Sequence, residues 1–503
     1  MRTKLLIIMS LTISLSSGSF FLPDYLTKKI NNKNFTEEEL DLALSLKLDV
    51  AYLEQLKRAG KGSFIWLKYA QEFAQKDGET SVVLADYYLE HKAIHKSKYW
   101  YLHAIKLNYH RARLPLAKLY FDQNQLALAK TVLIRDKSIP DDFLLFAMEV
   151  AIAQGDLSFI EKHKAKLNHT DSGNLLLAKL FAYKITVDEQ QNSIVPNTTS
   201  SKETCQNNLQ LFATTLADLE RIDLLKKQFK QSPLKQFICI ELPRYIPMNK
   251  LSCSHDKSSA IQCAEDVWSS IANDVDSRYL GLLYPYGGAN VHLGILYFDR
   301  EDTVDILSHE ILHLFGFIDE YPLPKGHAVC RGSQQEMFSH NIAVLKKSYT
   351  GNKSEVRTKV LKKIPWAKNI KSSTPILSKF SLVSNQAQAN ISQTDIWQLG
   401  TPELFEHEIG LFNADSCEGP SFRAFKPLSK RTHLLYYEIP LPREYLIFLI
   451  QKSEQFLMPS FHYNIAMALF RQGDIIEGKK WLLKAVDFEH KESRKLKVLH
   501  AEF

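Results

Sequence analysis

Apolar residues recur three or four positions apart through most of the first part of the chain. This spacing holds between about residues 36 and 185, where Gly and Pro are sparse and turns come at short intervals. A period of three to four residues is typical of amphipathic helices, because it places the apolar side chains on one face. The first part of the chain is therefore predicted to form one helix after another.

The pattern changes near residue 187. Residues 188–203 are polar, rich in Gln, Asn, Ser and Thr, which indicates a linker or a long loop. Residues 291–298 are apolar and β-prone and follow the sequence Tyr286-Gly287-Gly288, which predicts a strand within a mixed α/β region. The segment 287–290 is expected to be either a plain hairpin turn or an edge along which an extended peptide lies. After Pro442 the helical spacing returns.

Short sequences recur within the helical parts of the chain. Leu116–Leu119 is repeated as Leu177–Leu180, and Trp100–Ile105 is echoed by Trp481–Val486. Small Ala residues at fixed places let paired helices approach closely, and Gly-Asp pairs supply the turns. These features resemble tetratricopeptide or Sel-like helical repeats, which present an extended surface to a protein partner. An irregular helical bundle is the alternative.

These patterns predict a multidomain, mainly α chain in which α-helical repeat regions flank an α/β (α+β) domain. The expected boundaries, in chain order, are a signal peptide at 1–19, helical repeats at 20–187, a linker at 188–204, the mixed domain at 205–440 and further repeat-like helices at 441–503.

Size and charge exclude few functions. The chain has 503 residues, 45% of them hydrophobic and 24% charged, which is an ordinary globular balance with enough apolar surface for large cores. The formal net charge of +7 comes from Lys and Arg that are scattered along the chain. No DNA- or RNA-binding signature accompanies this mild excess, so no nucleic-acid partner is expected.

The first residues have the features of a secretory signal. Arg2 and Lys4 precede an apolar run from Leu5 to Leu15, and small residues follow at 16–19. The run is too short for a permanent membrane span, although an uncleaved interfacial or membrane helix is the alternative. No later segment is apolar for long enough to cross a bilayer. An exported protein, periplasmic or secreted, is expected.

The cysteines favour the same compartment. Six are present, and all lie in the middle of the chain. An even number beyond a signal sequence indicates disulfides in an oxidising compartment, and six cysteines allow fifteen pairings. Cys330 and Cys417 are one candidate pair, while isolated buried thiols are the alternative. No C-x-x-C pair exists, so a zinc ribbon or thioredoxin-type site is not expected.

Residues 302–321 carry the clearest chemistry in the chain. His309 and His313 are four positions apart on a predicted helix, so both imidazoles project from one face and can bind one zinc ion (Zn²⁺). Glu310 sits about 100° further around the helix, where it can reach a zinc-activated water as the general base. This combination is that of peptide-bond hydrolysis. Two histidines held by ordinary hydrogen bonds are the alternative.

A third metal ligand is expected after the helix. Gly316 permits a sharp reversal, because it lacks the Cβ that makes positive φ costly, and Asp319 follows three residues later. Asp319 is therefore predicted to be the third ligand. Glu320 is predicted to point the other way and to support the site. The alternative exchanges the roles of these two acids.

The motif resembles that of a known group of enzymes. His309-Glu310-x-x-His313-x-x-Gly316 followed by residues 317–321 is similar to the zinc motif of the metzincins, and its D-E-Y ending resembles the bacterial IgA-peptidase-like metallopeptidases. Residues 417–427 look like the segment that leads to the methionine-containing turn of that group. The resemblance implies zinc-dependent peptidase activity, with His309, His313 and Asp319 as ligands and Glu310 as base.

The sequence departs from that group in three respects. The IgA-peptidase-like motif tends to place its acidic pair one residue later than Asp319 and Glu320. Metzincins commonly have His where Asp319 stands, and no methionine marks the expected turn. Residues 432–434 fall where the turn is expected, and Met337 is a second candidate. Four other histidines could supply a ligand or a transition-state donor, or could be ordinary surface or structural residues: His327, His340, His407 and His433. Tyr321 could bind substrate or steady the oxyanion, and a packing role is the alternative.

The sequence therefore predicts an exported zinc endopeptidase that acts on protein or peptide substrates, with helical repeats that can bind a partner. Two other functions stay open: a helical-repeat interaction or scaffold protein with a structural or inactive zinc site, and a zinc amidase that acts on cell-wall peptides.

Overall fold

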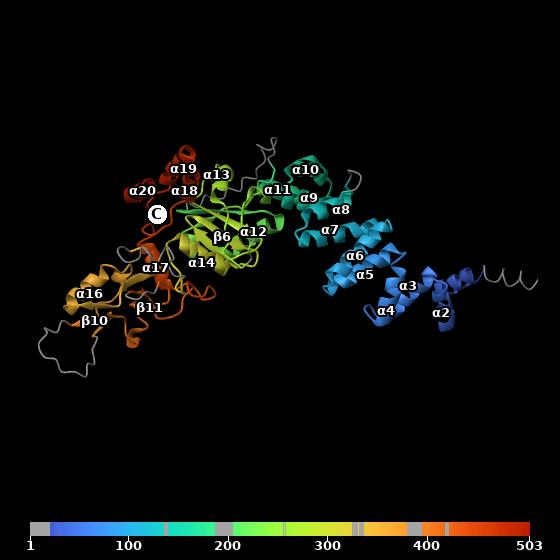
Figure 1. Ribbon diagram of the computed structural model, residues 1–503, viewed down its shortest axis with the longest axis horizontal. Helices are drawn as coiled ribbons and strands as arrows, with labels where there is room; N and C mark the ends of the chain where they lie inside the picture. The colour runs from blue at the N-terminus through green and yellow to red at the C-terminus, as the bar shows by residue number, and fades with distance from the viewer. Residues whose placement is uncertain are drawn as a thin grey trace, which may run out of the picture. The chain divides into compact units, whose positions relative to one another are not determined.

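The computed structural model (Figure 1) describes residues 21–134, 139–186, 205–254, 256, 258–323, 330, 337–379, 395–417 and 422–503. The predicted signal peptide at 1–19 and the predicted linker at 188–204 lie outside these residues. The described part is mostly α-helical, with an α/β part, as the sequence predicts. The chain divides into two compact units, one up to Gln154 and one from Gly155 onward. The predicted domain boundaries stay predictions.

The first unit is a succession of short helices. They are α2 (Glu37–Ser45), α3 (Asp49–Arg58), α4 (Phe64–Phe73), α5 (Gly78–Glu90), α6 (Ile94–Lys106), α7 (Arg113–Asp122), α8 (Leu126–Leu133) and α9 (Asp141–Gln154). Consecutive helices pack on one another, and small residues such as Ala85 and Ala104 are fully buried where α5 meets α6. This close approach is what the repeat-like sequence pattern predicts. Membership of a particular repeat class stays a prediction.

The second unit contains three further sets of helices. The first set is α10 (Leu157–His163) and α11 (Asp171–Ala182), the second is α12 (Leu216–Phe229), α13 (Trp268–Ile271), α14 (Val304–Leu314) and α16 (Lys353–Leu361), and the third is α17 (Arg443–Gln451), α18 (Phe461–Gln472), α19 (Ile475–Asp487) and α20 (Glu492–Leu499).

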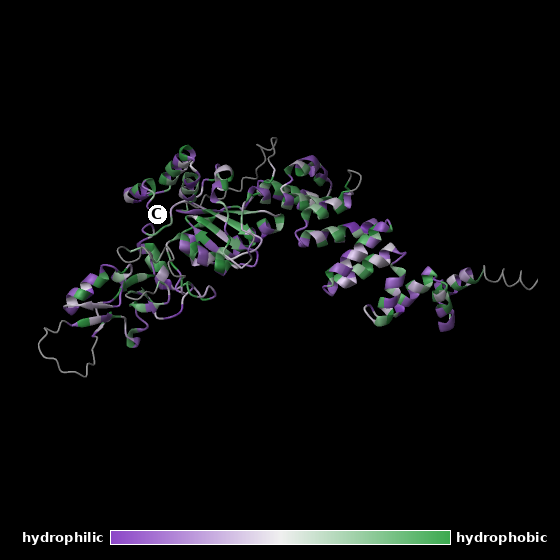
Figure 2. Ribbon diagram, in the orientation of Figure 1, coloured by the Kyte–Doolittle hydropathy of each residue, from purple (hydrophilic) through white to green (hydrophobic). Residues whose placement is uncertain are grey.

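The largest sheet of this unit has six strands. They are β1 (Asn208–Ala213), β2 (Cys239–Ile240), β3 (Arg244–Tyr245), β4 (Tyr279–Tyr284), β5 (Asn290–His292) and β6 (Ile295–Asp299). The order is β2-β1-β4-β6-β5, with β3 also paired to β1. All pairs are parallel except β5 with β6. β4 is buried along its whole length, as parallel strands covered on both faces are, and Figure 2 shows apolar residues concentrated in this sheet.

Helices cover both faces of the six-stranded sheet. α12 and α14 pack on one face. On the other face, alternate residues of β4 and β6, such as Leu282 and Tyr297, join a core with Trp268 of α13, Phe461 of α18 and Trp481 of α19. The C-terminal helices are therefore part of the core of the α/β region.

A buried group of charges strengthens this attachment. Arg278, just before β4, lies 2.7 Å from the carboxylate of Glu489, which also contacts Arg494 at 2.5 Å. A guanidinium of Arg278 also donates to the carbonyl of Met458 at 3.0 Å. Buried charges are tolerated only when they are paired in this way, so these residues fix the C-terminal helices against the end of β4.

Two smaller sheets complete the unit. One contains β8 (Ser348–Thr350), β10 (Ile396–Leu399) and β9 (Leu377–Lys379), and the other β11 (Phe412–Ala414), β12 (Phe422–Lys426) and β7 (Ala343–Lys346), in these orders. Their pairs are antiparallel.

The apolar run at 291–298 forms two strands, whereas the sequence pattern predicts one. β5 and β6 are joined by Leu293 and Gly294, whose φ values are +43° and +86°, and two consecutive residues with positive φ make a tight hairpin turn. A Cβ at Gly294 would lie 2.6 Å from the carbonyl oxygen of Pro459. The segment before α18 therefore packs directly on the turn.

The segment 287–290 is already paired. Gly288 donates to the carbonyl of Ser259 at 2.9 Å and accepts from the amide of Ile261 at 3.0 Å, and the side chain of Asn290 donates to the carbonyl of Ile261. These contacts occupy backbone groups that an added peptide strand would need. An extended substrate therefore does not pair with Gly288.

All six cysteines form disulfides: Cys205–Cys239, Cys253–Cys263 and Cys330–Cys417. Three disulfides fit an exported protein in an oxidising compartment, as the cysteine count predicts. None of the helices described is long and apolar enough to cross a membrane.

We expect the disulfides to differ in their contribution to stability. The Cys330–Cys417 bond joins residues 87 positions apart, against 10 for Cys253–Cys263. In the chain-entropy model a disulfide stabilises the folded state by restricting the unfolded chain. The longer loop contributes about 4–5 kcal/mol and the shorter loop about 3 kcal/mol. The double variant Cys330→Ala/Cys417→Ala should therefore unfold at lower urea concentration than Cys253→Ala/Cys263→Ala. An equal or reversed order would contradict this expectation.

The histidine on α18 makes stability depend on pH. His462 is stacked between Phe461 and Phe488, and burial lowers its pKa to about 3. The unfolded chain, with a His pKa of about 6.5, takes up the proton first as the pH falls. The stability that depends on a neutral His462 is therefore fully present above pH 6.5 and declines below it.

The variant His462→Phe should lose about 2 kcal/mol less stability than the natural chain between pH 7 and pH 5. Urea unfolding at the two pH values measures this difference. His490→Phe is the matched control, because His490 is exposed two residues after Phe488. Identical pH dependence in the His462→Phe variant and the natural chain would refute this role.

Candidate metal centre

The helix α14 places the motif against the sheet. Thr303 caps its start by accepting from the amide of Ile306, and Leu307, Ile311 and Leu314 are fully buried. The helix follows β6 directly, so the opposite face, which carries His309 and His313, is fixed relative to the sheet.

Backbone carbonyls hold both imidazole rings. Nδ1 of His309 lies 3.0 Å from the carbonyl oxygen of His433, and Nδ1 of His313 lies 3.0 Å from that of Phe317. A carbonyl can only accept, so each Nδ1 carries the hydrogen and each Nε2 of a neutral ring presents a lone pair. Histidine ligands of metals are commonly oriented by a hydrogen bond of this kind.

Asp319 completes a three-donor set. Its Oδ1 lies 3.0 Å from Nε2 of His309 and 3.3 Å from Nε2 of His313. Ligands about 2.1 Å from a tetrahedral ion are about 3.4 Å from one another. Two nitrogen donors and one carboxylate oxygen at these separations fit a zinc ion. The ligand atoms of His309, Glu310 and His313 also lie within 4.8 Å of one another, which is compatible with a metal ion.

The charge balance of the three donors also suits a cation. Burial opposes a charge on His313, but the carboxylate of Asp319 more than offsets it and raises the pKa of His313 to about 9. Burial likewise opposes the charge on Asp319, yet the two imidazoles hold its pKa far below the ordinary value. The arrangement favours a positive charge between these side chains, and a proton and a metal ion compete for that place.

Glu310 is the buried acid beside the donors. It is 6% exposed, and its Oε2 has no hydrogen-bond partner within the part of the chain that the structure describes. Burial raises the pKa of Glu310, while the nearby imidazoles lower it. An unpaired carboxylate oxygen inside a protein is costly, and its position next to the three donors suits a group that accepts a proton.

The reversal after α14 depends on Gly316. Its φ is +83°, and a Cβ at this position would lie 2.1 Å from the carbonyl oxygen of Phe456. Both the positive φ and the close approach require glycine. The reversal brings the carbonyl of Phe317 to His313 and then carries Asp319 back to the imidazoles.

Glu320 faces away from the imidazoles, into a buried polar network. Its side chain accepts from Lys426 at 2.8 Å, from Asn341 at 3.3 Å and from the hydroxyl of Tyr445. Its backbone amide donates to the carbonyl of Leu434 at 3.0 Å. Both side chains of the Lys426–Glu320 pair are almost completely buried. This network fixes the loop that carries Asp319.

The turn at residues 432–434 lies at the site. The carbonyl of His433 binds His309, and that of Leu434 accepts from Glu320. This is the position in the sequence where the resemblance expects a methionine-containing turn. Met337, the second candidate, has its sulfur 4.0 Å from the amine of Lys452.

The remaining histidine candidates differ in their surroundings. His340 is buried between Phe317 and Phe456, which indicates packing. His407 is 93% exposed and pairs with Glu406. His327 lies outside the described residues.

Tyr321 is half-exposed and next to the carboxylates. Burial, followed by the charge and hydrogen bonding of Asp319, raises the pKa of its hydroxyl. A neutral hydroxyl at this place is a hydrogen-bond donor.

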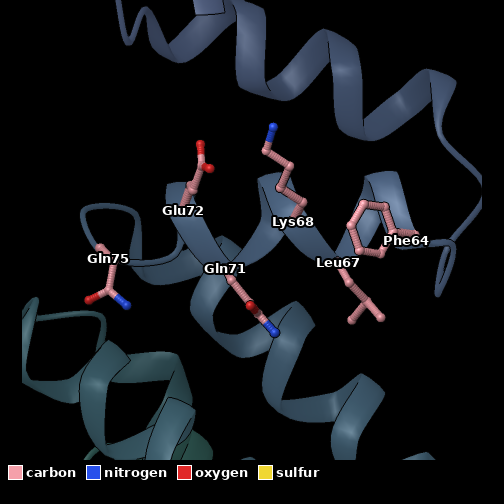
Figure 3. A pocket seen from close by; sticks show the side chains of 6 residues that line it. All are labelled: Phe64, Leu67, Lys68, Gln71, Glu72 and Gln75. Atoms are coloured by element: carbon pink, nitrogen blue, oxygen red, sulfur yellow. The ribbon is translucent and has the colours of Figure 1, made fainter. Parts of the chain in front are cut away.

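A hollow of about 580 Å³ lies on the first unit (Figure 3). Its lining residues come from α4 and the turn after it: Phe64, Leu67, Lys68, Gln71, Glu72 and Gln75. Lys68 and Glu72 extend to one side of the helix, and Leu67 and Gln71 to the other. The lining holds no histidine or cysteine and one carboxylate, so it offers no metal site.

The chain matches no protein-family model, and no curated protein is similar to it. The similarity to the metzincins therefore stays a resemblance of the motif.

We expect the two neighbouring acids to behave differently towards metal. Asp319→Ala removes one of three donors and should lower zinc affinity by about 100-fold or more, since the loss of an outer-shell partner alone costs about 10- to 100-fold. Glu320→Gln keeps a side chain of the same size for Lys426 and Tyr445 and should retain one zinc ion per chain. Zinc content after dialysis against a competing chelator measures both. Loss of zinc from the Glu320→Gln variant alone would exchange the two roles.

Proposed function

We propose that the protein is an exported zinc-dependent endopeptidase. The observation that carries the proposal is the convergence of two imidazole nitrogens and the Asp319 carboxylate, with the unpaired Oε2 of Glu310 beside them. The three disulfides support export. A purely structural metal site needs no buried, unpaired acid, so Glu310 favours the enzyme over a scaffold with a structural zinc ion.

His309, His313 and Asp319 would hold the zinc ion. When bound, the ion lowers the pKa of a coordinated water to about 7 and polarises the substrate carbonyl. The two backbone carbonyls keep each imidazole in the tautomer whose Nε2 can bind. With only these three side chains as donors, the site would leave a place for water or substrate on the ion, as catalytic zinc sites require.

Glu310 would transfer a proton from the attacking water to the leaving amine. Oε2 accepts the proton of the attacking water as the new C–O bond forms at the scissile carbonyl. The protonated carboxyl then delivers it to the nitrogen of the leaving amine as the C–N bond breaks. Burial favours the protonated form of Glu310 that exists between these two steps. Tyr321 is a candidate for contact with the substrate, because its half-exposed side chain lies close to Asp319.

We expect Glu310→Gln to abolish peptide hydrolysis while zinc stays bound. The amide has the same size but cannot accept the proton, so the rate should fall by about 10²-fold or more. Peptide cleavage and zinc content are measured on the same preparation. Glu301→Gln is the matched control, because Glu301 is an exposed acid near the start of α14.

Near-normal turnover in the Glu310→Gln variant would contradict the assigned base. Bound zinc with no cleavage of any peptide by the natural chain would favour the scaffold function. Release of cell-wall peptide fragments without cleavage of proteins would favour an amidase.

A further inference from the structure

A cavity of about 350 Å³ lies beside the candidate metal centre. Three segments and His433 line it. The segments are the end of α12 with the short helix Pro233–Gln236, the first two turns of α14, and residues 438–441. Its size is at the low end for ligand pockets and suits a single side chain rather than a whole cofactor.

The cavity adjoins the metal ligands. Asp305 lines it and lies one helical turn before His309 on the same face of α14. Ser308, directly before His309, lines it too. His433 also lines the cavity and contacts a metal ligand. The centroid of its ring lies 5.9 Å from that of His309, and its backbone carbonyl accepts the hydrogen bond from Nδ1 of His309. A side chain bound in the cavity would therefore lie next to the candidate metal centre.

The charged side chains that line the cavity are all acidic. Asp305 and Glu438 are the only acidic residues among the described lining residues, and no Lys or Arg is among them. The positive N-terminal end of the α14 dipole favours anions, but Asp305 already occupies that first turn. A cationic group entering the cavity would therefore meet two carboxylates and no opposing charge.

The other lining residues suit a long cationic side chain. Val304, Leu234, Ile439 and Leu441 supply apolar surface for the methylene stem of a lysine or arginine. Gln228, Gln231 and Ser232 supply neutral acceptors near the rim.

His433 adds a buried acceptor. The side chain is 4% exposed, and its Nε2 has no hydrogen-bond partner among the described residues. Nδ1 lies 2.8 Å from the carbonyl oxygen of Ile439, which can only accept, so Nε2 presents a lone pair. A buried polar atom without a partner is expected to meet one when the site is occupied, and here that partner is a donor.

We propose that this cavity binds a lysine or arginine side chain of the peptide substrate next to the scissile bond. The proposal rests on the proposed peptidase function, and it makes Asp305 and Glu438 residues that determine specificity.

Binding is measured separately from hydrolysis. The Glu310→Gln chain, loaded with zinc, is titrated with four fluorescent peptides that differ only at one central residue: Lys, Arg, Gln or Glu. Two partly exposed carboxylates should make the Lys and Arg peptides bind about 3- to 10-fold tighter than the Gln peptide. This preference should shrink as NaCl is raised, because both carboxylates are screened by salt.

Variants in the same background locate the preference. Asp305→Asn/Glu438→Gln should remove it, and Glu438→Lys should shift it towards the Glu peptide. Glu301→Gln keeps the preference, because Glu301 does not line the cavity. Equal affinities for all four peptides, or a preference that survives Asp305→Asn/Glu438→Gln, would overturn the proposal.

Cleavage by the natural chain separates this proposal from the peptidase function. Cleavage of all four peptides at equal rates, together with equal binding, would overturn the cavity proposal and leave the peptidase standing. Failure to cleave any peptide would overturn the peptidase function, and with it the place of the cavity beside a scissile bond.

Discussion

The Nε2 atoms of His309 and His313 face one carboxylate oxygen of Asp319, at 3.0 and 3.3 Å. Two lone pairs and a negative charge repel one another unless something positive lies between them. The backbone carbonyls that hold Nδ1 of each ring prevent the imidazoles from turning away. The chain therefore maintains an arrangement that is favourable only when a proton or a metal ion lies between these atoms. Much of the surrounding structure serves to maintain this arrangement.

That surrounding structure is drawn from distant parts of the chain. The loop that carries Asp319 is held by Lys426, Tyr445 and Asn341 through Glu320. The loop begins at Gly316, which packs against the backbone of Phe456. Buried charges are weak evidence for stability but can fix one arrangement among several. Here they fix a loop whose position decides whether Asp319 reaches the imidazoles.

The C-terminal helices belong to this support. α18 and α19 contribute to the core behind β4 and β6, Arg278 joins Glu489, and Tyr445 of α17 reaches Glu320. The helical periodicity after Pro442 resembles that of the N-terminal helices. In the folded chain this segment serves as part of the core, because its apolar face covers the six-stranded sheet and its Tyr445 holds the loop that carries Asp319.

The sequence by itself determined the local features of the protein. Helical spacing, the His309–His313 interval and the reversal at Gly316 depend on contacts within a few residues, and the number of cysteines was enough to predict disulfides. Only the tertiary structure decided the cysteine pairing, the division of the 291–298 run at Leu293 and Gly294, and the partners of Glu320. The pairs Lys426–Glu320 and His433–His309 are separated by 106 and 124 residues. No periodicity or spacing signals such pairs, because they form only when the sheet and the helices have packed.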